Sequence, residues 1–453
     1  VKISLGEGDK ADAMRLLDEI FEIEKDNSQA LITRARIELA EGRAVAAIAD
    51  LRTVIKNEPN SQEALMLLGN AHEAAGSVDL ALDSYKTAVS LNPRNELAML
   101  KIASLSMAEE DYETAKRLLF AVLDTNPSSS EARRLFTALY AQQENWTEAT
   151  KYAESLENSD TGNQSVLGMY LKSRIQVEQG NCSSALDTLK EVMQLEPNAV
   201  EALAQMKDCY VELGLEDEGR RYFLDHVSDN PEHAHAHALL GDLAFAVRDY
   251  GTASTAYSQA STLEPAKATH TIGLARALAA SGEEEAALDV YEELIESTPG
   301  STDARLYKAE LLEALEQYSN AAELYESVLK IDSSNIVASN NLAMILVDHL
   351  NSEENIRRAI EITEGFEETD YPALWDTRGW AYYHAAQYTL ALALLERVIA
   401  SPDAQAVFYY HIGMTHYKLG DLDQARMALA KSLGFPSAEF YGRDNARVLV
   451  GTI

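Results

Sequence analysis

Three histidines at alternate positions, His233, His235 and His237, are conspicuous in a chain that holds only ten histidines. On a β-strand all three side chains would share one face and could ligate a single metal ion. On an α-helix His233 and His237 lie one turn apart, whereas His235 lies about 200° around the axis from them. The flanking residues repeat with a helical period, so we predict no metal site. The alternatives are a helix start that uses histidine and a two-histidine site completed by an outside ligand.

The only two cysteines, Cys182 and Cys209, are the next candidates. Two cysteines are too few for a disulfide-rich fold or for a zinc site of four cysteines. The repeat described below places them at the same end of two successive repeats. They therefore either form a bond in an oxidising compartment or remain two buried thiols.

Known catalytic motifs do not assign an activity to this sequence. The sequence contains no phosphate-binding glycine loop, no His-Glu-x-x-His and no nucleophile elbow. Ser327 and Lys330 spell S-x-x-K, but the S-D-N and K-T-G motifs that accompany it in penicillin-recognising enzymes are missing. We therefore expect that the protein is not an enzyme and that it holds no cofactor.

The elements that carry these residues follow a fixed period. The interval is 34 residues between Pro59, Pro93 and Pro127, and again between Pro197, Pro231, Pro265 and Pro299. A small residue recurs in the second half of each repeat, as Ala13, Ala47, Ala81, Ala115, Ala149, Ala185, Gly219, Ala253, Ala287, Ala321, Ala359, Ala391 and Ala425. The spacing changes only before Ala185 and around Ala359, which predicts polar loops within 157–165 and 349–356. A period of this length indicates a solenoid.

Each repeat reads as two amphipathic helices. In residues 62–95, Leu65, Leu68, Gly69 and His72 recur at helical spacing, and a second helical pattern follows Gly76. Gly76 supplies the left-handed conformation that ends the first helix, and the proline closes the second. Valine, isoleucine and threonine do not form strand-like runs, so we expect an all-α fold.

The unit 62–95 resembles the tetratricopeptide repeat (TPR), whose Leu, Gly/Ala, aromatic, Gly, Ala, aromatic, Ala and Pro pattern it matches almost completely. The resemblance covers nearly the whole chain and implies a right-handed α-solenoid of about twelve helix pairs with a C-terminal capping helix. The predicted parts are the second half of a truncated unit (1–27), units 1–4 (28–165), units 5–9 (166–335), units 10–12 (336–433) and the capping helix (434–453). A protein or peptide partner in the concave groove is the function that this family implies.

Charge and hydropathy exclude some partners. Lys and Arg number 38 against 73 Asp and Glu, a net charge of −35, which repels nucleic acid. No stretch approaches 18 consecutive apolar residues, so we expect no transmembrane segment. Residues 1–27 contain only half a unit, so we expect that the natural protein continues upstream. The oligomeric state is left open.

In this family, fixed positions of each repeat line the concave groove, and in the last three units these positions hold aromatic and polar residues. First helices line the concave face, and aromatic side chains with polar tips are usual contact residues. The candidate partner-binding residues are Asn340, Asn341, Met344, Asp376, Trp380, Tyr383, His384, Tyr410, His411, Met414, Tyr417 and Lys418. The same aromatic residues could instead fill the core near the end of the solenoid.

Residues 340–433 resemble a narrower group, through Asn-Asn-Leu-Ala at 340–343 and Asp-Thr-x-Gly-Trp at 376–380. They are similar to the C-terminal repeats of bacterial envelope TPR proteins of exopolysaccharide export and PEP-CTERM sorting systems. The resemblance implies a periplasmic or outer-membrane-associated scaffold for proteins, and for a polysaccharide under export. The alternative is a cytosolic adaptor or regulatory peptide-binding protein.

Overall fold

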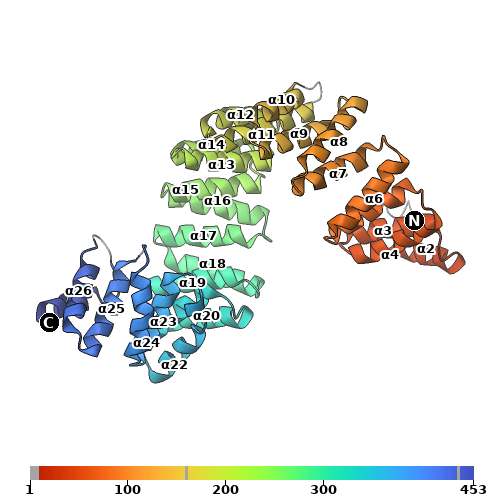
Figure 1. Cartoon of the computed structure of the whole chain (residues 1–453). Helices are drawn as coiled ribbons and strands as arrows, with labels where there is room; N and C mark the ends of the chain where they lie inside the picture. The colour runs from red at the N-terminus through yellow and green to blue at the C-terminus, as the bar shows by residue number, and fades with distance from the viewer. Residues whose placement is uncertain (1–9, 159–161, 403, 436–438) are drawn as a thin grey trace. The chain divides into compact units, whose positions relative to one another are not determined.

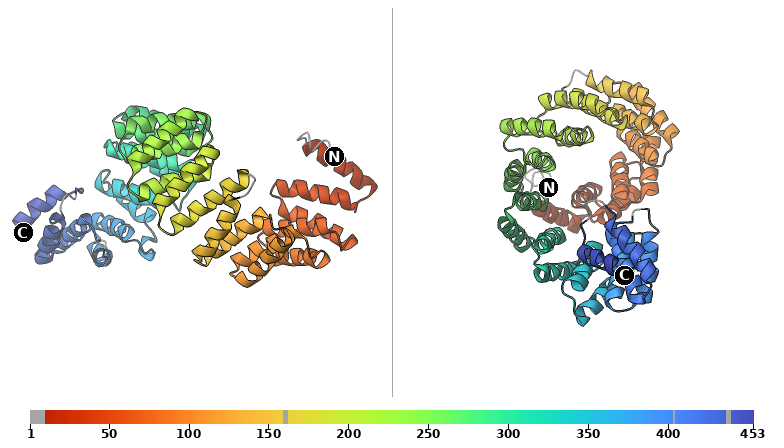
Figure 2. Two further views of the ribbon diagram at one scale, coloured as in Figure 1. Left: turned by 90° about the horizontal axis from the view of Figure 1, so that it is seen from above. Right: turned by 90° about the vertical axis from the view of Figure 1, so that its left-hand side faces the viewer.

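The computed structural model describes residues 10–158, 162–402, 404–435 and 439–453. In these residues it contains 26 α-helices and one short 3₁₀ helix, with no β-strand. Consecutive helices pack against each other in pairs and lie side by side along the chain (Figures 1 and 2). The predicted all-α fold of repeated helix pairs is confirmed. The chain forms two compact units, residues 1–215 and 216–453, each described by itself below.

Unit 1 starts in the second helix of a pair and ends in the first helix of a later pair. Its helices are α2 (Lys10–Ile23), α3 (Ser28–Ala40), α4 (Ala44–Asn57), α5 (Gln62–Ala74), α6 (Val78–Leu91), α7 (Glu96–Ala108), α8 (Tyr112–Thr125), α9 (Ser130–Gln142), α10 (Trp146–Glu157), α11 (Gly162–Glu178), α12 (Cys182–Leu195) and α13 (Val200–Glu212). The first helices begin at intervals close to the 34-residue period.

Unit 2 continues the alternation and ends in a terminal helix. Its helices are α14 (Glu216–Asp229), α15 (Ala234–Ala246), α16 (Tyr250–Leu263), α17 (Ala268–Ser281), α18 (Glu284–Ser297), α19 (Thr302–Ala314), α20 (Tyr318–Ile331), α21 (Ile336–Asp348), α22 (Glu353–Ile362), the 3₁₀ helix η1 (Phe366–Glu368), α23 (Pro372–His384), α24 (Tyr388–Ile399), α25 (Ala406–Leu419), α26 (Leu422–Leu433) and α27 (Arg443–Thr452). The expected capping helix is α27, in which Ala446 is fully buried.

Six first helices begin with an asparagine or serine whose side chain caps the helix. Its oxygen accepts a hydrogen bond from the backbone N–H three residues later, which satisfies one of the free donors of a helix start. This cap is made by Asn27, Ser61, Asn95, Ser129, Ser301 and Asn335. The sequence therefore defines the start of these six helices locally.

The recurrent small residues lie where the helices of a pair approach each other. Gly219 is buried and every alanine of the series is fully buried. At Gly69 an added methyl group would lie 2.2 Å from the ring of the fully buried Tyr85. A larger residue would force the helices apart, which explains why the series admits only alanine and glycine.

In every described pair except α21–α22, the turn between the two helices uses one residue with a positive φ. Gly76 has φ of +72°, as predicted, and a side chain there would meet nothing within 4 Å. Five repeats place other residues at this turn with φ between 54° and 62°: Glu110, Glu144, Arg248, Glu316 and Ala386. The turn geometry is therefore imposed by the helix pair even where glycine is missing.

The two predicted loops are shorter than expected. Residues 159–161 lie outside the described part, but α11 already begins at Gly162, so the end of the 157–165 loop is helical. In the second loop only residues 349–352 separate α21 from α22, since Ser352 caps α22 through its hydroxyl. Polar composition alone misplaced both boundaries because polar residues also start helices.

Candidate functional site

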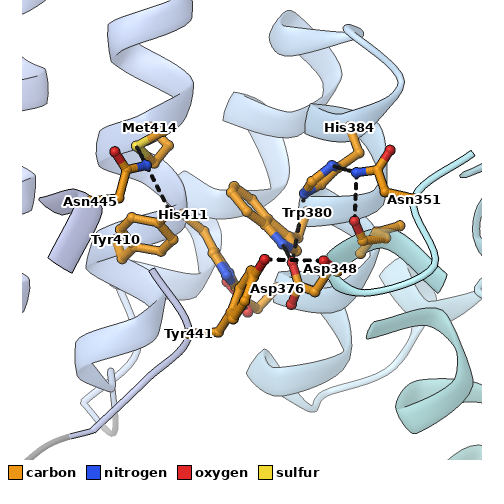
Figure 3. Close-up of polar contacts among 11 residues, drawn as sticks. Asp348, Asn351, Asp376, Trp380, His384, Tyr410, His411, Met414, Tyr441 and Asn445 are labelled. Carbon is orange, nitrogen blue, oxygen red and sulfur yellow. Dashed lines mark hydrogen bonds and ion pairs between the residues drawn. The ribbon is translucent and has the colours of Figure 1, made fainter. Parts of the chain in front are cut away.

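The candidate partner-binding residues lie on three successive first helices of unit 2, α21, α23 and α25. Helix α23 contacts both α21 and α25 directly. Each of the three helices is the first helix of its unit, so equivalent places of the unit project toward the same face of the three helices. The candidate residues therefore form one contiguous cluster, shown in part in Figure 3.

Trp380 lies at the centre of this cluster and is only 2% exposed. Its ring stacks on His411 with centroids 4.0 Å apart and on Tyr383 with centroids 4.3 Å apart. The indole N–H donates a hydrogen bond of 2.8 Å to Oδ1 of Asp348 (Figure 3). Burial of an indole is favourable when its N–H finds such a partner.

A second buried pair lies next to the tryptophan. Nδ1 of His411 lies 2.8 Å from Oδ2 of Asp376, and both residues are nearly inaccessible. Because a carboxylate only accepts, Nδ1 carries the proton and donates it. This contact joins α25 to α23 and satisfies a carboxylate that would be costly to bury alone.

His384 lies at the C-terminal end of α23. The Asn351 amide donates hydrogen bonds to the Val347 carbonyl and to Nδ1 of His384, the latter at 2.8 Å. Nδ1 is thus an acceptor, which leaves the proton of the neutral ring on Nε2, 3.7 Å from Oδ1 of Asp348. Burial, followed by the charge of His411, lowers the pKa of His384 to about 4. Burial also raises the pKa of Asp348, while the Trp380 hydrogen bond acts to lower it.

The C-terminal segment closes this cluster. The Asn445 amide donates to the hydroxyl oxygen of Tyr410 at 3.3 Å, and the Tyr441 hydroxyl donates to the backbone carbonyl of Asp348 at 3.1 Å. Gly442 has φ of +89°, and a methyl group there would lie 2.3 Å from the Tyr410 ring. The capping segment thus covers part of the face that the sequence assigned to a partner.

Five of the candidate residues are buried: Asp376, Trp380, Tyr410, His411 and Met414. These five residues fill the core near the end of the solenoid, which was the alternative to partner binding, because the capping segment and the neighbouring rings enclose them. Asn340, Asn341, Met344, Tyr383, His384 and Tyr417 are half-buried, and Lys418 is exposed. A contact surface therefore stays a prediction for the accessible residues.

The two asparagines are already engaged within the fold. Oδ1 of Asn340 accepts a 2.7 Å hydrogen bond from the Thr377 hydroxyl, and the Asn341 amide donates to the Tyr325 hydroxyl at 3.1 Å. Asn340 also donates to Asn341 at 3.2 Å. Both residues therefore link α21 to its neighbours.

Sequence reasoning missed Asp348, Asn351, Tyr441 and Asn445. Asp348 could have been found, because it occupies the thirteenth place of its unit, the same place as His384 and Lys418. Asn351, Tyr441 and Asn445 lie outside the repeat frame, so no periodic signal marks them. Arg378 was also missed as a structural residue. It is buried, forms an ion pair with Glu367 at 2.6 Å and donates to the Ile360 carbonyl at 3.1 Å.

The other candidates lie elsewhere. His233 caps α15 by accepting a 3.2 Å hydrogen bond from the Ala236 N–H, and Nε2 of His237 donates to the Pro231 carbonyl at 2.9 Å. His235 is half-buried, and burial lowers its pKa. Within the described ranges, no group of three His, Cys, Asp or Glu side chains is arranged to hold a metal ion. His233 is therefore part of a helix start, which was the first of the two alternatives.

Both cysteines are free and buried in unit 1, so the structure shows the thiol alternative. The Cys182 thiol donates to Oε2 of Glu212 at 3.2 Å and is hydrogen-bonded to Cys209. Burial raises the pKa of both thiols. The predicted proximity of the two residues across successive repeats is confirmed.

Family models of known repeats match most of the chain in separate segments. Two models described as tetratricopeptide repeat match residues 4–70 and 176–243, and residues 238–302, 285–336 and 377–437, respectively. A third, the TPR domain of cytochrome c-type biogenesis protein H, matches residues 50–165. Each of the two units thus contains matched repeats.

Curated relatives are distant. The chain is 25% identical over 170 residues to ER membrane protein complex subunit 2-A of Xenopus laevis and to subunit 2 of Xenopus tropicalis. The match covers 38% of this chain and 56% of each relative. The chain therefore spans little more than half the length of these relatives.

Solved structures with a similar arrangement include two helical repeat proteins. The APC/C hetero-tetramer Cut9–Hcn1 aligns over 100% of this chain and 94% of its own, with 16% identity and a TM-score of 0.42. Yeast Tom70 aligns over 90% of this chain and 96% of its own, with 14% identity and a TM-score of 0.42. No helix in the described residues is long and apolar enough to span a membrane.

Proposed function

We propose that this tetratricopeptide repeat protein is a non-enzymatic scaffold that binds a protein partner at the end of its repeat array. The contact surface is the C-terminal rim, defined as Tyr383, His384, Tyr417 and Lys418. These residues occupy the twelfth and thirteenth places of the first helices α23 and α25, and they are half-buried or, for Lys418, exposed. Tyr383 and Tyr417 are partly accessible and Lys418 is exposed, whereas the His384 ring is only 16% exposed and the cluster beneath it is closed.

The observation that carries this proposal is the rigid support beneath the rim. Tyr383 stacks on Trp380, which is held in turn by Asp348 and His411. Burial raises the pKa of the Tyr383 hydroxyl, and the nearby hydroxyls of Tyr410, Tyr388 and Tyr417 raise it further. Aromatic side chains held in one conformation lose little entropy on binding, so they are effective contact residues.

The rim suits a partner with both apolar and polar groups. The faces of Tyr383 and Tyr417 offer apolar area, and their hydroxyls offer hydrogen bonds. Within the described part of the chain Lys418 forms no ion pair, and it adds a cation to an otherwise acidic protein. A protein segment that presents an aromatic or aliphatic side chain next to a carboxylate would satisfy all three residues.

The proposed location is the bacterial cell envelope, with a role in exopolysaccharide synthesis, export or protein sorting. Support for this finer assignment is the resemblance of residues 340–433 to envelope TPR proteins. The alternative, a cytosolic adaptor, rests on the same repeats. Fractionation of cells that produce the native protein tests the location. Recovery with the envelope supports the proposal, and recovery in the cytosolic fraction favours the adaptor.

The rim itself is tested by pull-down from envelope extracts with the wild-type chain and a Tyr383→Ala/Tyr417→Ala variant. We expect the variant to lose partners that the wild type retains. Tyr371→Ala is the matched control, because Tyr371 is 65% exposed and lies just before α23, outside the rim. Equal recovery by all three proteins would remove the rim as the contact surface.

A further inference from the structure

Five of the ten histidines lie where helices α14, α15, α16 and α17 of unit 2 are connected. They are His226 in the last turn of α14, His233 just before α15, His235 and His237 at the start of α15, and His270 at the start of α17. The ring centroids of His226 and His233 are 5.9 Å apart. This part of unit 2 therefore concentrates imidazole groups, the side chains whose charge ordinarily changes near neutral pH.

His233 is the N-cap of α15. The six first helices described above use an oxygen of asparagine or serine as the cap, an acceptor that does not change its charge with pH. In α15 the acceptor is Nδ1 of His233, which accepts a 3.2 Å hydrogen bond from the backbone N–H of Ala236. An imidazole nitrogen accepts only while it carries no proton, so the proton of the neutral ring lies on Nε2. The cap of α15 therefore depends on the charge state of one side chain.

Protonation of His233 removes this cap. A proton on Nδ1 turns the acceptor into a donor that faces the N–H of Ala236, so the hydrogen bond is lost. The positive charge also lies at the N-terminal end of α15, where the helix dipole disfavours cations. Nε2 of His233 is buried and has no hydrogen-bond partner among the described residues, so no acceptor there compensates the charged ring.

On the side of α14, the charged and titratable groups of this connection are His226, Asp229 and Glu232. Burial, followed by the charge of His233, lowers the pKa of His226, while Asp229 acts to raise it. A proton on either ring therefore opposes a proton on the other. Asp229 and Glu232 are exposed, so water screens their attraction for a charged imidazole.

On the side of α16 and α17, the charged and titratable groups are Glu264, Lys267 and His270, since α16 itself contains no charged side chain. Glu264 already pairs with Lys267 at 2.9 Å and with His270 at 3.2 Å. Burial lowers the pKa of His235, and the charges of Lys267 and His233 lower it further, while Glu264 acts to raise it. The folded connection thus favours neutral imidazoles. The stability that they contribute is present above about pH 6.5 and is lost as the pH falls below that value.

We propose that His233 makes the start of α15 a proton-sensitive hinge between two successive repeats. At neutral pH the uncharged ring caps α15, and the first turn of α15 stays closed against α14. On acidification the cap is lost, the first turn opens, and the buried residues Ala234, Ala236 and His237 become accessible to water. The 2.9 Å hydrogen bond from Nε2 of His237 to the Pro231 carbonyl belongs to the closed state and is lost with it. Opening changes how the repeat before α15 is held against the repeat that α15 begins.

Hydrogen–deuterium exchange of the full-length chain, read by mass spectrometry on peptides that cover residues 231–243, tests the hinge. Wild type, His233→Asn and His233→Ala are compared at pH 7.5 and pH 5.5, after correction for the intrinsic pH dependence of amide exchange. We expect the protection of the start of α15 in the wild type to fall about fivefold at the lower pH, as for the loss of an N-cap. His233→Asn carries the cap that Asn95 and Asn335 provide in other repeats, so it should stay protected at both pH values. His233→Ala should be poorly protected at both.

The start of α21 is the internal reference, because Asn335 caps it in the same unit of the same chain. Its protection should change much less with pH than that of α15. An equal loss at α21 would mean that acid opens unit 2 as a whole, and it would overturn the local hinge. The proposal would also be overturned by an equal pH response in wild type and His233→Asn, or by wild-type protection of His233→Ala at pH 7.5.

Discussion

The indole N–H of Trp380 donates a 2.8 Å hydrogen bond to the carboxylate of Asp348, 32 residues earlier in the chain. The two residues belong to successive first helices, α23 and α21. Asp348 is thereby held as an acceptor in an interior where an unpaired carboxylate is costly. This bond connects the repeat that contains the lengthened loop to the C-terminal repeats.

We predict that Trp380→Phe lowers the free energy of unfolding of unit 2 by about 1–3 kcal/mol. Phenylalanine keeps most of the stacking on His411 and Tyr383 but removes the donor, which leaves the buried Asp348 acceptor unsatisfied. Urea unfolding followed by circular dichroism measures the change. In a double-mutant cycle with Asp348→Asn the two effects should be less than additive. Additive effects would show that this hydrogen bond does not couple the two helices.

Acidification should destabilise the C-terminal cluster. The pKa of His384 falls from 6.5 to about 4 on folding, so between these values the unfolded state binds more protons than the folded state. His384 therefore leaves the free energy of unfolding at its full value above pH 6.5. As the pH falls from 6.5 toward 4, the free energy of unfolding decreases by on the order of 3 kcal/mol. His384→Gln should flatten the pH dependence of the urea midpoint between pH 7 and pH 4. Identical slopes in both proteins would contradict the prediction.

Other histidines add to the wild-type slope, so only the difference between the two proteins is informative. Burial also lowers the pKa of His72, His226 and His235. Their contributions have the same sign and remain in His384→Gln. The difference in slope between the wild type and His384→Gln therefore reports on the His384 ring.

The left-handed turns predict opposite effects of two substitutions. Gly76→Ala should destabilise unit 1 by about 1 kcal/mol, because a Cβ is disfavoured at φ of +72° although it would touch nothing. Glu144→Gly should be neutral or stabilising, because Glu144 already has φ of +54°. Thermal unfolding of both variants measures the effects. A destabilised Glu144→Gly would indicate that the glutamate side chain contributes to the turn.

The two thiols should be unreactive in the folded protein. Burial raises the pKa of Cys182, with further increases from its hydrogen bonds to Cys209 and Glu212, so little thiolate forms at pH 8. Iodoacetamide should add no label to the native chain and two labels in denaturant without reductant, as read by mass spectrometry. If denaturant alone gives no label and reductant restores both, the native protein contains the bond that the sequence left open.

Much of the fold was predictable because its determinants are local. The cap at Asn95 acts within one turn, Gly76 permits the positive φ of its turn without strain, and Ala81 marks a helix contact inside a single repeat. Each signal recurs every 34 residues, so errors in one repeat are corrected by the next. The loop before Gly162 was mispredicted where this repetition fails.

The candidate site was only partly predictable. The repeat frame located α23 and α25 and their aromatic residues correctly. It could not tell that Tyr410 would be covered, because the segment with Tyr441 and Asn445 lies outside the period.

The sequence by itself determined that this chain is a series of paired helices, and it located the small residues at which the helices of a pair approach each other. These properties depend on interactions within about one repeat, and the period makes them visible. Only the tertiary structure decided that Trp380 and His411 are buried, that Tyr383 remains accessible and that Cys182 meets Cys209. Exposure and proximity across repeats depend on how neighbouring helices and the capping segment pack, and no local pattern encodes that packing.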